Sequence, residues 1–243
     1  MKKPLFLFLA LLSYLNGFSF GDRISLGLTV APGISWLKPM GNEINNGVAG
    51  FGLQYGLNIE YYFKYRNYAI STGIFGGIND AGLHGRDTLT TLNSGKSVLE
   101  RYNTNNLILP LYLKLKTNPF RKRFILFGEV GFQMVFNVSA RANYSSSVPS
   151  PYNGGALVTV DKENVLPNGN AVQGLIPDFR YNIFDFRLSA GGGLEYIIHD
   201  RTSLIFSLHY NNGFVNAIDD KSVNPKHDGT VARNLLFTIG AMF

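Results

Sequence analysis

The chain has 243 residues, of which 45% are hydrophobic, 14% aromatic and only 16% charged. Soluble domains carry about 25% charged residues, so this composition indicates a protein whose surface need not face water. The absence of cysteine excludes a disulfide framework and a thiolate metal site. The net charge of +6 comes from scattered basic residues without a nucleic-acid-binding motif, and we expect no nucleic-acid partner.

The first segment, MKKPLFLFLALLSYLNGFSFGD, has the pattern of a secretory signal. Lys2 and Lys3 precede an apolar run over 4–15, and small and polar residues follow it. The run is shorter than the about 20 residues of a spanning helix, which makes a retained anchor the weaker alternative. We therefore predict a cleaved signal peptide over 1–19 and a single domain over 20–243.

Most of the remaining chain alternates with a period of two, which is typical of β-strands with two different faces. In FGLQYGLNIEYYF (51–63) every odd position is apolar or aromatic, and in NLILPLYLKLK (106–116) five leucines share one face. Pro110 interrupts the second pattern, because proline has no N–H to give to a central strand. The segments that this pattern predicts as strands are 24–34, 50–63, 68–78, 106–116, 124–140, 183–198, 203–211 and 234–243.

An even number of strands permits a closed up-and-down barrel. The predicted connections alternate between short turns at 64–67, 117–123 and 199–202 and long polar segments at 35–49, 79–105, 141–182 and 212–233. This alternation is typical of bacterial outer-membrane barrels. The predicted fold class is all-β: an eight-stranded antiparallel transmembrane barrel with short periplasmic turns and long extracellular loops.

The charges predict which face lines the lumen. One face of the strands is nearly free of charge and would be an aggregation hazard in water, whereas in lipid it forms the wall. Ser139 is predicted on the inner face together with Glu129, Gln133 and Asn137. Because unpaired charges in a confined lumen are unfavourable, we predict a lumen charge network. Its predicted members are Glu60, Lys114, Glu129, Asp185, Arg187 and Glu195.

The last strand ends on an aromatic residue, Phe243, preceded by apolar residues at alternate positions. In a barrel with an even number of strands it pairs with the first strand, and both termini lie on the periplasmic side. This pattern resembles the carboxyl-terminal signal that outer-membrane barrels present to the barrel assembly machinery. The predicted signal residues are Leu235, Phe237, Ile239 and Phe243, with the small residue Ala241 at one of its apolar positions.

Catalysis and metal binding are the remaining chemical alternatives. Ser207 and His209 share a face, and Asp219, Asp220, His227 and Asp228 follow, so a Ser–His–carboxylate set is conceivable. The Gly-x-Ser-x-Gly elbow is absent, and hydrogen-bonding filler in a polar lumen explains both residues equally well. The pairs His84/Asp87 and His227/Asp228 supply too few ligands for a metal site. We expect no enzymatic activity, catalytic residue, cofactor or metal.

Three blocks of the chain resemble the PorT-like outer-membrane β-barrel family. They are NLILPLYLKLK, FGEVGFQMVFNVSA and FDFRLSAGGGLEYIIHDRTSLIFSLHYNNGFVNA. The resemblance covers most of 22–243 and implies an outer-membrane barrel. The founding member is associated with a secretion system, whereas many relatives have no assigned role, and no catalytic residue is carried over.

Together these patterns predict a monomeric barrel in the outer membrane of a Gram-negative bacterium, in contact with outer-membrane lipid. An eight-stranded barrel has a lumen that side chains fill. We expect a structural or accessory component of an envelope or secretion complex, acting through its loops on an envelope partner. The longest, 141–182, is predicted to carry a hairpin arm at 156–160. The alternatives are a narrow porin-like transport or ligand-binding barrel and, more distantly, a surface lipid hydrolase or protease.

Overall fold

The computed structural model describes residues 23–40, 44–86, 97–149, 157–162, 165–166, 180–199, 202–219 and 230–243. The predicted signal peptide at 1–19 lies outside these residues. Within them, no helix is long and apolar enough to cross a bilayer.

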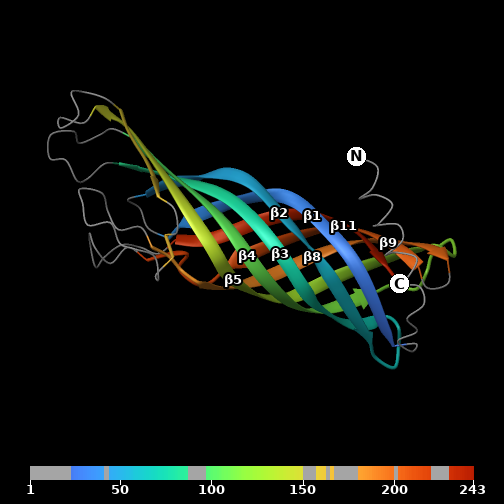
Figure 1. Ribbon diagram of the computed structural model, residues 1–243. Helices are drawn as coiled ribbons and strands as arrows, with labels where there is room; N and C mark the ends of the chain where they lie inside the picture. The colour runs from blue at the N-terminus through green and yellow to red at the C-terminus, as the bar shows by residue number, and fades with distance from the viewer. Residues whose placement is uncertain are drawn as a thin grey trace, which may run out of the picture.

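Eight antiparallel strands form a closed barrel (Figure 1). Each pairs with the next around the wall, β4 pairs with β5, and β1 pairs with the last strand, β11. The predicted eight-stranded antiparallel barrel is therefore confirmed. Its strands are β1 (Ile24–Pro39), β2 (Ile44–Tyr62), β3 (Tyr68–Arg86), β4 (Ser97–Lys116), β5 (Phe124–Pro149), β8 (Phe184–His199), β9 (Thr202–Gly213) and β11 (Thr230–Met242).

Three short strands lie outside the barrel wall. β6 (Leu157–Lys162) pairs antiparallel with the far part of β5, as expected for the predicted arm at 156–160. β7 (Arg180–Tyr181) pairs with β10 (Ile218–Asp219) in a separate two-stranded sheet.

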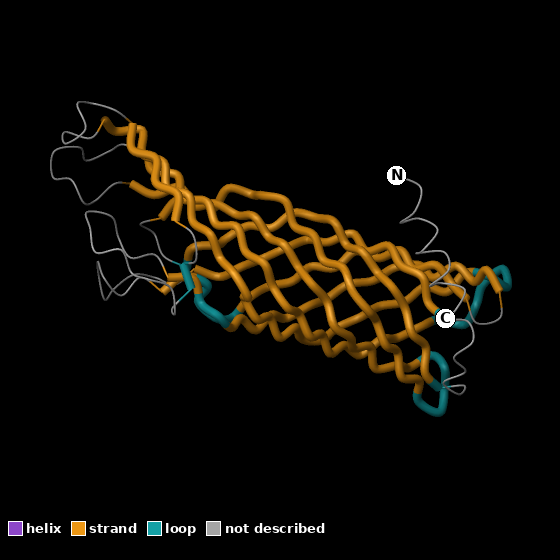
Figure 2. Tube along the Cα trace, in the orientation of Figure 1, coloured by secondary structure: helices purple, strands orange, loops and turns teal. Residues whose placement is uncertain are grey.

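The two ends of the barrel differ in their connections, which Figure 2 shows confined to these ends. At one end, here called the turn end, 63–67 and 117–123 join neighbouring strands. The chain closes the barrel here, since the N–H groups of Phe243 and Leu26 each donate to the other residue's carbonyl, at 2.7 and 3.0 Å. The opposite end is called the loop end.

The strands extend further toward the loop end than predicted. The segments that belong to wall strands although they were predicted as long connections are 35–39, 44–49, 79–86, 97–105, 141–149, 212–213 and 230–233. The physical reason is a change on the outer face: Arg101, Asn103 and Asn105 continue the exposed row of leucines on β4 as polar residues. The inner face there mixes apolar residues such as Tyr102 with polar ones such as Thr104. The apolar-outside alternation that predicts the wall strands therefore ends while the backbone pairing continues.

A β-bulge at Val138 exchanges the two faces of β5. Asn106 pairs with Asn137 and Asn105 pairs with Ser139, so Val138 is the extra residue. The prediction of Ser139 on the inner face is therefore wrong. Ser139 Oγ instead accepts a hydrogen bond from Asn105 Nδ2 at 2.9 Å on the outer face.

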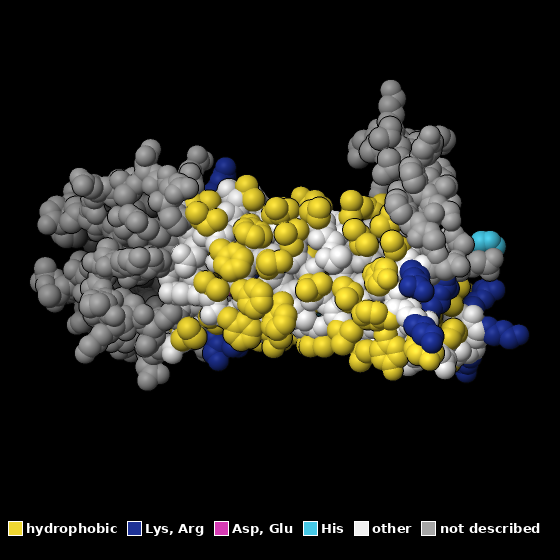
Figure 3. Space-filling view, turned by 90° about the horizontal axis from the view of Figure 1, so that it is seen from below, with side chains coloured by type: hydrophobic (Ala, Val, Ile, Leu, Met, Phe, Trp, Pro, Cys, Tyr) yellow, Lys and Arg dark blue, Asp and Glu magenta, His cyan; other side chains and the backbone are white. Residues whose placement is uncertain are grey.

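The outer wall is apolar between the two ends. Figure 3 shows hydrophobic side chains covering the middle of the barrel. Leu57, Leu111, Leu126 and Leu208 are among the half-exposed residues of this band. A surface of this kind matches lipid, and the closed barrel satisfies its backbone hydrogen bonds internally.

At Pro110 a side-chain hydrogen bond replaces part of the backbone pairing between β3 and β4. The β3–β4 pairing is interrupted between Thr72–Leu111 and Phe75–Ile108, the stretch of β4 that contains Pro110. Thr72 Oγ1 donates to the Pro110 carbonyl at 2.8 Å, so a side chain supplies a hydrogen bond where the ladder is interrupted.

Candidate functional site: the barrel lumen

The turn-end half of the lumen holds a buried network of charged side chains. Lys114 Nζ lies 2.5 Å from Glu60 Oε1 and 3.0 Å from Glu129 Oε1. Lys116 Nζ lies 2.8 Å from Glu60 Oε2 and 2.7 Å from Glu195 Oε2. Each ammonium therefore joins two carboxylates, and the strands that carry Glu60 and Glu195 are not neighbours of the strand that carries the lysines. The network crosses the lumen.

Aromatic and hydroxyl groups complete the surroundings of these charges. Lys114 Nζ is 3.9 Å from the centroid of the Phe127 ring. The Tyr62 hydroxyl donates to Glu60 at 2.7 Å and accepts from Lys116 at 2.8 Å. Ser203 donates to the second oxygen of Glu195 at 2.6 Å. A buried ion cluster is tolerated when its remaining donors and acceptors are satisfied in this way.

The structure brings four of the six predicted network residues together: Glu60, Lys114, Glu129 and Glu195. Asp185 and Arg187 form a separate buried pair at 2.5 Å, and among the described residues no ion pair joins it to the others. Lys116 belongs to the network although it was not predicted as a member. Its spacing of two residues from Lys114 places it on the same face of β4, a signal that the sequence contains.

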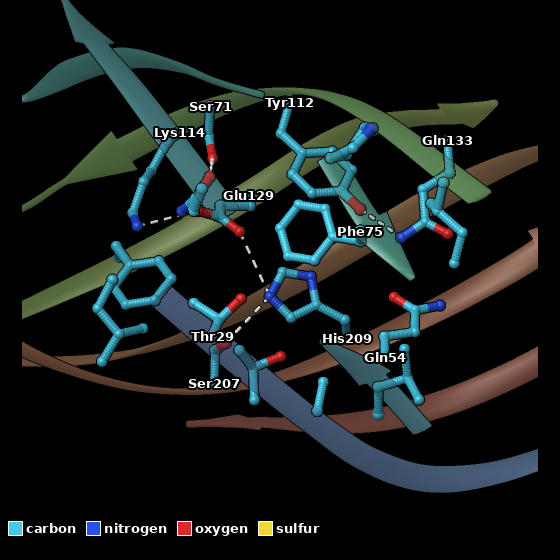
Figure 4. Close-up of a pocket in the computed structure, with 18 residues that line it drawn as sticks. Thr29, Gln54, Ser71, Phe75, Tyr112, Lys114, Glu129, Gln133, Ser207 and His209 are labelled. Atoms are coloured by element: carbon cyan, nitrogen blue, oxygen red, sulfur yellow. Dashed lines mark hydrogen bonds and ion pairs between the residues drawn. The ribbon is translucent and has the colours of Figure 1, made fainter. Parts of the chain in front are cut away.

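His209 extends the network toward the middle of the barrel. Figure 4 shows dashed lines from its ring to Glu129 and Ser207. Glu129 Oε2 lies 3.3 Å and Ser207 Oγ 3.0 Å from the same ring nitrogen, Nε2. In a Ser–His–carboxylate triad the serine and the carboxylate occupy different ring nitrogens. This arrangement is thus a hydrogen-bonded junction and lacks the geometry of a triad.

The His209 ring has room in the lumen because its pairing partner on the neighbouring strand β8 is a glycine, Gly191. A Cβ on Gly191 would lie 2.5 Å from His209 Nδ1 and 2.6 Å from the Leu208 carbonyl oxygen. On the other side, the Tyr112 ring stacks on the imidazole with centroids 5.9 Å apart. Gln133 donates to the Tyr112 hydroxyl at 2.5 Å.

A cavity of about 60 Å³ lies beside these residues. A water molecule needs about 10–15 Å³ of cavity volume, so the cavity has room for a few waters. Its polar lining includes Lys114, Glu129, Gln133, Ser207 and His209, and its apolar lining includes Phe75 and Ile108. The lumen at this level is a small chamber.

Further toward the loop end the lumen is lined by amides. Asn211 donates to Asn234 at 2.5 Å across neighbouring strands. In the part of the chain that the structure describes, several buried polar atoms of the lumen have no protein partner, and such atoms in native proteins are commonly satisfied by ordered water. They include Gln54 Nε2, Asn106 Oδ1, Gln133 Oε1 and Ser189 Oγ.

An apolar cluster, here called the apolar cap, lies at the loop end of the lumen. Val165, Tyr181, Ala217 and Ile218, from the connections, pack against residues of the barrel strands. The Tyr181 ring lies 5.8 Å from that of Tyr102. The strand residues of the cap are Leu37, Ala81, Leu83, Tyr102, Ala140, Ala142 and Ala232.

Backbone hydrogen bonds hold the cap segments in place. Val165 N donates to the Ala140 carbonyl at 2.9 Å, and Tyr181 N donates to the Val165 carbonyl at 2.8 Å. Ala217 N donates to Thr230 O at 2.6 Å. The lumen is thus bounded by ion pairs at the turn end and by apolar packing at the loop end. The cap was not predicted, because its segments are short apolar islands in connections that are otherwise polar.

The structure describes only some of the residues that were considered for catalysis or metal binding. Asp220, His227, Asp228 and Asp87 lie outside the described residues, as do the side chains of His84 and Asp219. In the described part of the chain, no group of three or more His, Cys, Asp or Glu is placed to hold a metal ion.

The predicted terminal signal residues lie on the outer face of β11. Phe237 and Ile239 are exposed, and Leu235 and Phe243 are partly exposed. They alternate with the inward-facing Asn234, Leu236 and Met242, which are buried.

Several solved outer-membrane proteins are similar to this chain. Ail, the attachment invasion locus protein of Yersinia pestis, is 12% identical with a TM-score of 0.36, covering 91% of this chain and 99% of that chain. OprG from Pseudomonas aeruginosa is 12% identical with a TM-score of 0.43, covering 91% and 94%. The outer membrane protease OmpT from Escherichia coli is 10% identical with a TM-score of 0.43, covering 92% and 97%. No curated protein is significantly similar in sequence.

The match to a protein family covers most of the chain and includes seven of the eight wall strands, β1 to β9. Residues 16–219 match the family described as outer membrane protein beta-barrel domain. The chain belongs to this family and is an outer-membrane β-barrel protein.

Proposed function

We propose that this protein is a non-conducting barrel that serves as a structural or accessory component of the bacterial envelope. The observation that carries the proposal is the double closure of the lumen. Ion pairs of Lys114 and Lys116 cross it at the turn end, and the apolar cap fills it at the loop end. A barrel of this kind offers its outer wall and its ends for function.

In this proposal the turn end faces the periplasm and the loop end faces the exterior of a Gram-negative cell. Short periplasmic turns and longer extracellular connections are the usual orientation of bacterial barrels. Both chain termini would then be periplasmic, and Leu235, Phe237, Ile239 and Phe243 would address the chain to the barrel assembly machinery. Residues 1–19 would act as the cleaved signal peptide.

The loop end would carry the contact with an envelope partner. β5 has 26 residues, whereas a membrane-crossing strand needs about 9–11, so its far part with β6 reaches beyond the bilayer. The resemblance to the PorT-like family supports a role in a protein-secretion complex, and this assignment is the finer part of the proposal.

Co-purification of envelope proteins with a tagged natural chain, compared with a variant whose β5–β6 arm is shortened, tests this function. Tyr144 pairs with Val160 and Ser145 with Thr159, so an Asn-Gly turn replacing 146–158 would close a shorter hairpin. The β5–β8 pairing begins at Phe136 and is untouched. We expect a stoichiometric envelope partner with the natural chain and its loss with the shortened chain, both remaining heat-modifiable on gels. A folded natural chain without any partner would contradict the proposal.

A narrow transport or ligand-binding barrel is the second candidate, and the cavity of about 60 Å³ with its unpartnered polar atoms favours it. Solute or ion flux into liposomes that contain the folded barrel would support it over the accessory role.

We also infer that the barrel is not an enzyme, because Ser207 and Glu129 share one nitrogen of His209. Hydrolysis of lipid or peptide that disappears in the His209→Ala variant would contradict this inference.

A further inference from the structure

Six exposed basic residues gather at the turn end of the barrel and are here called the basic rim. They are Arg23, Lys64, Arg66, Arg121, Lys122 and Arg123. Figure 3 shows Lys and Arg side chains at this end directly beside the hydrophobic band, with no acidic side chain visible among them on that face. In the sequence, Asp22 precedes Arg23 and Asp200 precedes Arg201, so these acidic residues do not cancel the positive excess of the rim.

Hydrogen bonds join the parts of the rim into one surface. Asn67 Nδ2, in the β2–β3 turn, donates to Asn118 Oδ1, in the β4–β5 turn, at 3.0 Å. Arg23 O accepts from the N–H of Tyr62 at 2.7 Å, which places Arg23 beside the end of β2. Arg123 O accepts from the N–H of Ile197 on β8 at 2.8 Å. The rim therefore runs continuously from β1 to β8 along the side that includes β2 to β5.

Aromatic side chains flank both basic turns. Tyr61, Phe63, Tyr65 and Tyr68 are exposed around Lys64 and Arg66. On the other turn, Phe120 stacks on Phe124 with centroids 5.6 Å apart, and Arg123 Nη1 donates to the Tyr196 hydroxyl at 3.0 Å. Aromatic rings collect where a membrane wall meets the polar headgroups, so the cations beside them lie at headgroup depth.

In the β4–β5 turn, two basic residues occupy positions whose backbone conformation favours other residue types. Arg121 and Lys122 have φ values of 50° and 62°, and Arg123 N donates to the Phe120 carbonyl at 3.3 Å, as in a type I′ turn. Asn-Gly is the favoured pair for these two positions. A strained conformation held by two basic residues at the tip of a turn points to a role for their charge.

We propose that the basic rim binds the phosphate groups of anionic phospholipids in the leaflet that surrounds the turn end. Guanidinium and ammonium groups pair strongly with phosphate oxygens, and an anionic lipid surface attracts basic residues next to a membrane segment. The adjoining apolar wall favours a lipid over a soluble polyanion, because the acyl chains pack on it while the headgroup meets the cations. Only the identity of the leaflet, the periplasmic one, rests on the proposed function.

Native mass spectrometry of the full-length barrel in detergent, titrated with phosphatidylglycerol or phosphatidylcholine, tests this site without reference to orientation in the cell. We expect preferential retention of phosphatidylglycerol that weakens as salt is raised. Arg121→Gln/Lys122→Gln should lower its affinity roughly 25-fold at low salt, since each basic residue near an anionic surface contributes about fivefold. The charge-keeping exchange Arg121→Lys/Lys122→Arg should stay within about twofold.

Lys38→Gln/Arg101→Gln removes two exposed charges far from the turn end and should leave retention unchanged. Lys64→Gln/Arg66→Gln, in the other basic turn, repeats the test if the first variant folds poorly. Equal retention of both lipids by the natural chain, or unchanged retention after either rim substitution, would overturn the proposal. Stronger binding of soluble peptidoglycan fragments than of phosphatidylglycerol would assign the rim to a different partner and overturn it as well.

Discussion

Lys114 Nζ lies 2.5 Å from Glu60 Oε1, although the two residues belong to strands that are separated by β3 in the barrel. A contact of this kind fixes the distance between two parts of the wall and obstructs the lumen between them. Both side chains are almost completely buried, at 1% and 0% exposure. Their charges are therefore stable only as members of the network.

The sign of the charge removed should decide how much stability is lost. With His209 counted as neutral, three carboxylates (Glu60, Glu129, Glu195) face two ammonium groups (Lys114, Lys116). Lys114→Met leaves three carboxylates with one ammonium and should lower the free energy of unfolding by about 3–5 kcal/mol. Glu129→Gln leaves two of each and should cost clearly less. Urea unfolding in lipid vesicles measures both, and equal losses would contradict this assignment of the network.

Substitution of Gly191 should displace His209. The added methyl group of Gly191→Ala would meet both the imidazole and the Leu208 carbonyl, and overpacking of this kind costs about 1–3 kcal/mol. Gly128→Ala is the control, since the nearest atom to its new Cβ is the Gly191 oxygen at 3.9 Å. It should change stability by less than about 0.5 kcal/mol. A larger loss at Gly128 than at Gly191 in the same urea titration would refute this packing.

The apolar cap should shield the lumen from reagents at the loop end. Because the natural chain has no cysteine, single thiols can report access. Ser189→Cys places a thiol at an inward position that is 1% exposed and should resist a water-soluble maleimide. Tyr181→Ala with Ala217→Asp removes a ring and puts a charge into the cap, so the same thiol should then react.

Asn103→Cys, on the outer face at the loop end, serves as the reactive reference for this labelling experiment. Rapid labelling of Ser189→Cys with an intact cap would show that the loop end of the lumen is open in solution.

Phe243 should matter more for assembly in cells than for the stability of the finished barrel. Phe243→Ala keeps the backbone bonds to Leu26, so refolding of the purified chain into detergent should be nearly unchanged. If the terminal residue is part of an assembly signal, the amount of heat-modifiable barrel in the outer membrane should fall. Phe206→Ala removes an equivalent ring from the outer face of β9 and should leave this amount unchanged. The same decrease for both variants would indicate lost lipid contact as the cause.

The sequence was most informative where the wall meets lipid. Leu107 to Leu115 and the odd positions of 51–63 alternate because one face must be apolar and the other must fit a polar lumen, so both strands and their facing could be predicted. Toward the loop end the outer face of β4 becomes polar at Arg101, Asn103 and Asn105, and the inner face mixes Tyr102 with Thr104. The apolar-outside alternation of the wall therefore gives no signal for a strand there.

Other features depend on contacts between distant parts of the chain. The bulge at Val138 reverses the facing of Ser139 without a local signal, because a one-residue offset is set by the pairing with β4. The apolar cap combines Val165, Tyr181 and Ala217, which are separate in sequence and meet only in the fold. Charge balance was enough to predict that Lys114 has a carboxylate partner. That this partner is Glu60, across the lumen, could be seen only in the three-dimensional structure.

The central claim, a lumen closed at both ends, is tested most directly by planar-bilayer recording of the folded natural chain. We expect no discrete conductance steps with the network and the cap intact, because ion pairs cross the lumen at the turn end and apolar side chains pack together at the loop end. Tyr181→Ala/Ala217→Asp together with Glu129→Ala loosens both closures and provides the positive comparison. Steady single-channel currents from the natural chain that change in the Glu129→Ala variant would contradict the claim and favour a narrow transport barrel.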